Sequence, residues 1–255
     1  MSEQTITREV DKLDQILAKL LARKSIDKAY IWMRWGCVGL SAMVFIAWQF
    51  ALRDGRTLLA DPSQWQTIDH HLPRRAYDKT RRWLEKNFIL RYDDLRVRPW
   101  TIVTSAFSHV DFYHFAANTM SFNGFFSCLG VFLSPIQLAG CLLSSTVGGS
   151  VAYLEQQRRK LPSQRRRALG MSGMVTGMGV AAGVLNPWFP VSVFGLPMPL
   201  WVGISGYIAW DTWFLSSETS TTGHSAHLGG AAAGLLYGLG MRYGRLLPLS
   251  KSNNF

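Results

Sequence analysis

The chain has 255 residues, of which 48% are hydrophobic and only 17% charged, whereas soluble domains usually carry about 25% charged residues. The formal net charge of +11 comes from basic residues outside the apolar runs, so membrane topology and anionic lipid explain it better than nucleic acid. No RNP, zinc-finger or basic-zipper motif is present. Cys37, Cys128 and Cys141 lie in or beside apolar stretches without disulfide or metal-site spacing, and we interpret them as packing residues.

Residues 1–34 form a polar N-terminal segment. Apolar residues recur at helical spacing over residues 13–21, which predicts a soluble or interfacial helix. Acidic residues among the basic ones argue against a transit peptide, and the first apolar run begins too late, near residue 35, for a cleaved signal.

The first apolar run, residues 35–52, is just long enough to cross a bilayer core, which takes about 20 residues. A long polar connection follows over residues 53–98, and its amphipathic stretch 83–90 is suited to the membrane interface. Prolines punctuate five further apolar segments, at residues 100–126, 131–154, 168–186, 196–215 and 226–245. The pattern predicts an all-α membrane protein, a bundle of six transmembrane helices with a long connection between the first two and a C-terminal tail at 246–255.

Six spans would place the long connection and the loops at 155–167 and 216–225 on one side of the membrane. That side carries most of the 27 lysine and arginine residues. The positive-inside rule therefore predicts that it faces the cytosol or the mitochondrial matrix.

Two apolar segments carry polar side chains that a lipid-facing helix would avoid, which makes those side chains candidates for function. Each lies on a helical face with small residues: His227, Gly230, Gly234 and Gly238 on the sixth segment, and Ser172, Thr176, Gly179 and Gly183 on the fourth. Stripes of small residues let membrane helices approach closely. We therefore expect the Ser172 hydroxyl within hydrogen-bonding reach of the His227 imidazole, the minimum for a serine nucleophile activated by a base.

Ser172 also lies near the start of its predicted helix, where backbone N–H groups are unpaired and the helix dipole is positive. Such groups can stabilise an oxyanion, and so can His114 and Asn118, which are four residues apart on one face of the second segment. His109, in the same segment, is about 140° around the helix from His114. We expect His109 to pin the neighbouring loop.

Other interpretations of these residues stay open. Small-residue stripes commonly serve packing alone, and paired histidines on different spans can bind haem or a metal, although no HExxH or cysteine-based spacing supports a zinc site. The surroundings of Ser172 and Ser225 only imitate the hydrolase GxSxG elbow. No acid is obviously placed to orient His227, so the sequence does not support a Ser-His-Asp triad, and we interpret Asp211 as a buried structural carboxylate.

Three motifs follow one another along the chain: His109, His114 and Asn118; then Gly170-Met171-Ser172-Gly173; then Ala226-His227-Leu228-Gly229-Gly230 with Gly234. Together they resemble the rhomboid family of intramembrane serine proteases. The resemblance covers about residues 35–245, the predicted catalytic domain. Stretches such as Ala209-Trp210-Asp211-Thr212 resemble the mitochondrial, presenilin-associated rhomboid-like type.

The resemblance implies a serine endopeptidase that cleaves transmembrane segments of other membrane proteins, with Ser172 as nucleophile and His227 as base. His114 and Asn118 would stabilise the oxyanion. Five further residues would shape the site: His109, Gly170, Gly173, Gly230 and Gly234. The implied partners are transmembrane substrates and membrane lipid, with no nucleic acid, metal or other cofactor. The implied location is the mitochondrial inner membrane or another endomembrane, as a multi-pass protein. The alternative is a catalytically inactive relative that binds membrane clients for quality control, against which the intact Ser172 and His227 argue.

Two positions depart from the family pattern. The Trp-Arg pair of many bacterial members is here Trp100-Thr101, which indicates a different anchor for the long connection. The tyrosine usually found four residues after the nucleophile is Thr176, so stacking support for His227 is lost or supplied elsewhere.

Overall fold

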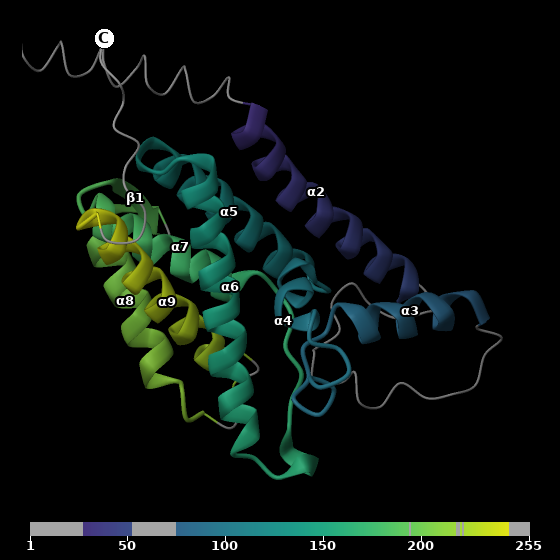
Figure 1. Cartoon of the computed structure of the whole chain (residues 1–255). Helices are drawn as coiled ribbons and strands as arrows, with labels where there is room; N and C mark the ends of the chain where they lie inside the picture. The colour runs from purple at the N-terminus through teal and green to yellow at the C-terminus, as the bar shows by residue number, and fades with distance from the viewer. Residues whose placement is uncertain (1–27, 53–74, 194, 218–219, 221, 245–255) are drawn as a thin grey trace, which may run out of the picture.

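A computed structural model describes residues 28–52, 75–193, 195–217, 220 and 222–244. Most regular structure in these residues is helical (Figure 1). The helices are α2 (Lys28–Ala51), α3 (Arg75–Asn87), α4 (Thr101–Thr104), η2 (Ser105–Phe107), α5 (Phe112–Phe132), α6 (Pro135–Arg158), η3 (Pro162–Gln164), α7 (Ser172–Leu185), α8 (Leu200–Trp213) and α9 (His224–Arg242). A short antiparallel hairpin, β1 (Pro190–Val193) and β2 (Leu196–Pro199), precedes α8.

Helix α7 is the central element of the bundle. It contacts α5, α6, α8 and α9, and all its residues from Gly173 to Gly179 are buried. The helix α2 lies at the outer edge and contacts α5, while α3 crosses the end of α2 (Figure 1). Helix α7 is therefore enclosed by α5 and α6, which precede it in the chain, and by α8 and α9, which follow it.

Membrane-spanning character is clearest in α2. Of the described helices, it alone combines the length and mean hydropathy of a span, with 24 residues and an 18-residue stretch whose mean hydropathy is 1.4. It begins at Lys28, inside the predicted polar segment, whereas α7 is apolar but has only 14 residues. In α6, polar side chains such as Gln137 and Thr146 are buried and lower the hydropathy. The predicted helical architecture is confirmed, and the count of six spans and their orientation stay predictions.

The predicted segment 100–126 is wrong as a single helix. It begins as α4 and η2, leaves helical structure at residues 108–111, and resumes as α5. Asp111 caps α5, because its side chain accepts a hydrogen bond from the backbone N–H of His114 at 2.7 Å. His109 therefore lies in the connection before α5 and not in a span.

Other helix starts also differ from the prediction. Helix α6 begins at Pro135 rather than at 131, because α5 continues to Phe132 and Ser134 caps α6, and α9 begins at His224 rather than at 226. Helix α7 begins at Ser172 rather than at 168, because Gly170 has φ of +110° and turns the chain just before it. Helix α8 begins at Leu200 rather than at 196, because the two prolines of β2 hold an extended backbone. The predicted helix at 13–21 and the tail at 246–255 lie outside the described residues.

The stretch predicted to lie at the membrane interface is attached to the rest of the protein. Leu84 of α3 is fully buried in a cluster with residues of α2. Leu90 and Ala168 exchange backbone hydrogen bonds of 2.9 and 3.0 Å, which tie the long connection to the chain before α7. The Trp100 Nε1–H donates to Asn87 Oδ1 at 3.2 Å. These contacts are the anchor of the connection in this chain.

Helices α7 and α9 touch along a ladder of glycines. A Cβ added at Gly230 would lie 2.0 Å from the carbonyl oxygen of Gly173, and one added at Gly234 would lie 2.0 Å from that of Gly177. No real Cβ approaches a backbone oxygen so closely. The stripe predicted on the His227 face is therefore the face of α9 that contacts α7.

The stripe predicted on α7 is offset from its real contact face. A Cβ at Gly179 would meet Ile204 of α8 and Phe125 of α5, not α9. The glycines of α7 that lie against α9 are Gly173 and Gly177, and Ala181 continues this face opposite Gly238. Because α7 has small residues on several sides, its periodicity alone does not identify the face that meets α9.

Gly230→Ala is expected to lower the stability of the folded bundle. The added methyl group would force α9 away from α7, and overpacking of this kind costs about 1–3 kcal/mol or more. Thermal unfolding in detergent should therefore show a lower Tm. Gly206→Ala is the matched control, because a Cβ at Gly206 in α8 has nothing within 4 Å. Equal Tm values for both variants would contradict the close contact.

Candidate active site

The turn before α7 presents Ser172 at the first position of the helix. The backbone N–H of Gly170 donates to the carbonyl of Ser105 at 2.9 Å. The next N–H, of Met171, donates to Nε2 of the fully buried His109 at 3.3 Å. His109 thus contacts the turn beside Ser172 from the connection before α5, and the role predicted for it, pinning a neighbouring loop, stays a prediction.

Ser172 and His227 meet between α7 and α9. The Ser172 Oγ lies 2.8 Å from His227 Nε2. His227 is 5% exposed, whereas Ser172 is partly exposed. Gly230 lies one helical turn after His227, and the close approach at this glycine brings the imidazole to the hydroxyl. The structure therefore brings together the two residues that the sequence paired.

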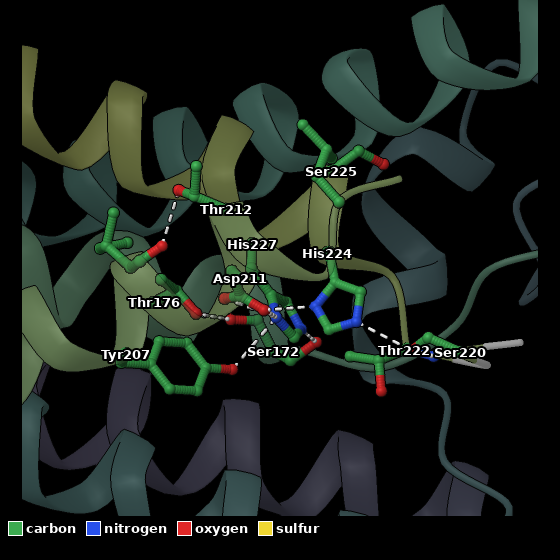
Figure 2. Close-up of polar contacts among 12 residues, drawn as sticks. Ser172, Thr176, Tyr207, Asp211, Thr212, Ser220, Thr222, His224, Ser225 and His227 are labelled. Atoms are coloured by element: carbon green, nitrogen blue, oxygen red, sulfur yellow. Dashed lines mark hydrogen bonds and ion pairs between the residues drawn. The ribbon is translucent and has the colours of Figure 1, made fainter. Parts of the chain in front are cut away.

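Asp211 of α8 is the acidic neighbour that sequence reasoning missed. Its two carboxylate oxygens each lie 3.0 Å from His227 Nδ1, and Oδ1 lies 2.6 Å from His224 Nδ1 (Figure 2). The carboxylate is 1% exposed. The interpretation that no acid is placed to orient His227 is wrong, because the ends of α8 and α9 converge in the fold.

Tyr207 supplies an aromatic neighbour for His227. Its ring centroid lies 5.7 Å from that of the imidazole with an angle of 32° between the planes, and its hydroxyl is 3.1 Å from His227 Nδ1. Thr176 instead donates its hydroxyl to the carbonyl of Ser172 at 2.8 Å. The support missing at position 176 thus comes from α8. Tyr207 and Asp211 are four residues apart in an apolar helix, and this spacing is the sequence signal that could have identified both.

His114 and Asn118 lie one turn apart on α5. The His114 imidazole sits against Gly170, where a Cβ would lie 2.6 Å from its Cε1 atom. Asn118 is 7% exposed and donates one amide hydrogen to the carbonyl of His114 at 2.8 Å, which leaves the second hydrogen of that amide for another acceptor. The structure thus places His114 beside the turn that precedes Ser172.

Asp211, His224 and His227 also form the group of described residues that could ligate a metal. Their potential ligand atoms lie within 4.8 Å of one another, and all three residues are buried. The same atoms are joined by hydrogen bonds between imidazole and carboxylate, so hydrogen bonding accounts for their proximity.

Residues 96–244, more than half of the chain, match the family model of the Rhomboid domain. The chain is 28% identical over 159 residues to "Rhomboid protein 1, mitochondrial" of Saccharomyces cerevisiae, an alignment that covers 62% of this chain and 46% of that protein. It is 28% identical over 177 residues to "RHOMBOID-like protein 12, mitochondrial" of Arabidopsis thaliana, covering 64% and 53%.

A third relative, "Rhomboid-like protein 16, chloroplastic" of Arabidopsis thaliana, is 29% identical over 146 residues, which cover 51% of this chain and 45% of that protein. The chain thus spans about half the length of the curated relatives it matches. No solved structure matches the chain significantly.

Proposed function

The chain belongs to the rhomboid family, and from this premise we propose that it is an intramembrane serine endopeptidase that cleaves transmembrane segments of other membrane proteins. The observation that carries the proposal is the 2.8 Å contact between Ser172 Oγ and His227 Nε2. An imidazole at this distance can take the hydroxyl proton as the oxygen attacks a carbonyl.

In the proposed mechanism, Ser172 Oγ forms a bond to the scissile carbonyl carbon while His227 Nε2 takes the hydroxyl proton. The tetrahedral intermediate collapses with cleavage of the C–N bond, and His227 gives its proton to the leaving amine. A water molecule, deprotonated by His227, then attacks the acyl-enzyme. The bond between the acyl carbon and Ser172 Oγ breaks, the second product leaves as the acid, and His227 returns its proton to Ser172 Oγ. Asp211 accepts the Nδ1–H of His227, which keeps Nε2 available as the base and stabilises the imidazolium.

Two groups of donors are proposed to stabilise the oxyanion. The first is the N-terminal turn of α7, whose backbone N–H groups have no partner within the helix and lie at the positive end of its dipole. The second is the pair of His114 and Asn118 on α5. His114 lies against Gly170, two residues before the nucleophile, so its imidazole is near the position where charge develops.

His114→Ala is expected to lower kcat by about 10²–10³-fold, the usual effect of losing one oxyanion donor. The KM should stay unchanged, because the donor acts on charge that exists only in the transition state. Steady-state cleavage of a reporter transmembrane substrate measures both constants. Tyr113→Ala is the matched control, since Tyr113 is the neighbouring residue on α5 and is 72% exposed. A kcat as high in the His114 variant as in this control would remove His114 from the mechanism.

A fluorophosphonate probe tests the proposed activity without a known substrate. Such a probe reacts with an activated serine, so the purified full chain should become labelled at Ser172. The same preparation should cleave a reporter transmembrane substrate in liposomes. Protein that is neither labelled nor able to cleave, but still retains membrane proteins on purification, would favour the catalytically inactive alternative.

The catalytic domain is proposed to cover residues 35–245, and its membrane to be the mitochondrial inner membrane. The second proposal is supported by two relatives whose names include "mitochondrial", while a third is named chloroplastic. Fractionation of cells followed by carbonate extraction tests it, because an integral protein stays with the membrane pellet of its own organelle.

A further inference from the structure

A second histidine shares the carboxylate that faces the proposed base. His224 lies three residues before His227 on α9, and its Nδ1 is 2.6 Å from Asp211 Oδ1, closer than the 3.0 Å between that oxygen and His227 Nδ1. His224 is 6% exposed and Asp211 is 1% exposed. The buried carboxylate is therefore held by two imidazoles, of which the proposed mechanism uses one.

The proton positions in this group follow from its partners. An ionised carboxylate only accepts hydrogen bonds, so both Nδ1 atoms that contact Asp211 carry hydrogen. In a neutral imidazole, the Nε2 of His224 is then an acceptor, and the Ser220 hydroxyl, 2.8 Å away, donates to it. Figure 2 shows this row of contacts from Ser220 through His224 to Asp211.

The ring of His224 is held on two further sides. Its centroid lies 5.9 Å from that of Phe214, the residue that follows α8, with an angle of 27° between the rings. Ser220 is in turn fixed by Arg166, whose Nη1 donates to the Ser220 carbonyl at 2.6 Å. The orientation of His224 is thus set by groups outside the pair of Ser172 and His227.

Helix α8 has few other buried anchors. Leu200 at its start and Asp211 near its end are its two buried residues, whereas Trp210 and Trp213 are 60% and 83% exposed. The carboxylate of Asp211 is therefore the buried polar group that joins the end of α8 to α9, beside the ring contacts of Tyr207 and Phe214. The carboxylate that faces His227 Nδ1 has His224 Nδ1 as its nearer partner.

We propose that His224 is a positioning residue for the proposed base, acting through Asp211. Its Nδ1–H holds Oδ1, so that the carboxylate stays aimed at the Nδ1–H of His227 and the lone pair of His227 Nε2 stays aimed at Ser172. This inference rests on the proposed function and extends it to a residue that touches neither the nucleophile nor the base through a hydrogen bond.

His224→Leu removes the donor and leaves part of a buried carboxylate without a partner. Misplacement of catalytic groups by about 1 Å can cost roughly 10²-fold in rate, so we expect a kcat about 10²-fold lower with KM unchanged. His224→Asn keeps an N–H donor, because its Nδ2 is separated from the backbone by the same bonds as Nδ1 of histidine. The asparagine variant should therefore restore most of the lost kcat.

The experiment measures kcat and KM for a reporter transmembrane substrate with the full chain in liposomes, and the rate of fluorophosphonate labelling of the same samples. The variants are Ser172→Ala, His224→Leu, His224→Asn, Asp211→Asn and the double variant Asp211→Asn/His224→Leu. If His224 acts through Asp211, His224→Leu should add no further loss once Asp211 is replaced, because the two changes then act on one interaction.

Three results would overturn the inference: a normal kcat in His224→Leu, an asparagine variant as impaired as the leucine variant, or a full additional loss in the double variant. The last two would show that His224 serves stability alone or acts by another route. Ser172→Ala separates this failure from failure of the proposed function. An inactive Ser172→Ala with a normal His224→Leu rejects the inference alone, whereas cleavage by Ser172→Ala rejects the proposed function.

Discussion

Ser172→Ala is expected to abolish measurable cleavage of a reporter transmembrane substrate. Loss of the nucleophile in a serine protease lowers kcat by about 10⁶-fold, because no covalent intermediate forms. The hydroxyl removed is the group 2.8 Å from His227 Nε2. Alanine fits the first position of α7 without strain, since Met171 is the N-cap residue of that helix and the Ser172 hydroxyl contacts His227. The folded bundle should therefore keep its Tm.

Ser144→Ala is the matched control for this substitution. Its hydroxyl donates to the carbonyl of Cys141 on the same helix at 3.1 Å, and a bond of this kind contributes little to an apolar helix. The control variant should cleave and become labelled like the unchanged protein. Cleavage by Ser172→Ala at the rate of this control would reject the serine mechanism outright.

Asp211→Asn is expected to lower kcat by about 10⁴-fold, as the equivalent change does in a soluble Ser-His-Asp protease. Asparagine has nearly the same shape, but its amide NH₂ can donate to His227 Nδ1. The imidazole would then carry its hydrogen on Nε2 and could not accept the proton of Ser172. The loss comes from the wrong tautomer, so KM should change little.

Steady-state kinetics and fluorophosphonate labelling together test whether Asp211→Asn changes the tautomer of His227. The Asp211 variant should bind substrate with the KM of the unchanged protein, while its rate of labelling by a fluorophosphonate falls with kcat. Thr212→Val is the neighbouring control, because the Thr212 hydroxyl donates to the carbonyl of Ile208 on its own helix at 2.7 Å. A normal kcat in Asp211→Asn would show that His227 is oriented without the carboxylate.

Sequence reasoning paired Ser172 with His227 from residue type and spacing. A hydroxyl and an imidazole on apolar, glycine-rich helices are costly in lipid, so each indicates function. Helical periodicity also placed Gly230 and Gly234 on the face below His227, and this face is the one that contacts α7. The choice of residues and of the glycine face concerns one helix at a time, and for it local sequence is sufficient.

The break before α5 was hidden because residues 108–111 lie within an otherwise apolar stretch. Asp111 is the signal that could have revealed it, since an aspartate three residues before His114 is a typical helix cap. The apolar pattern accordingly predicts His109 in a span, whereas it lies in the connection before α5. The expected role of His109 beside the loop of Ser172 did not depend on that assignment.

The chain by itself predicted that a hydroxyl at Ser172 and an imidazole at His227 meet between two glycine-rich helices, and the structure places them 2.8 Å apart. Only the tertiary structure decided that Asp211 and Tyr207 of α8 face His227, that His224 shares the carboxylate, and that Gly173 rather than Gly179 meets α9. The physical reason is that periodicity describes the sides of a single helix. Which side meets a neighbour depends on how several helices rotate and slide until their small residues fit together.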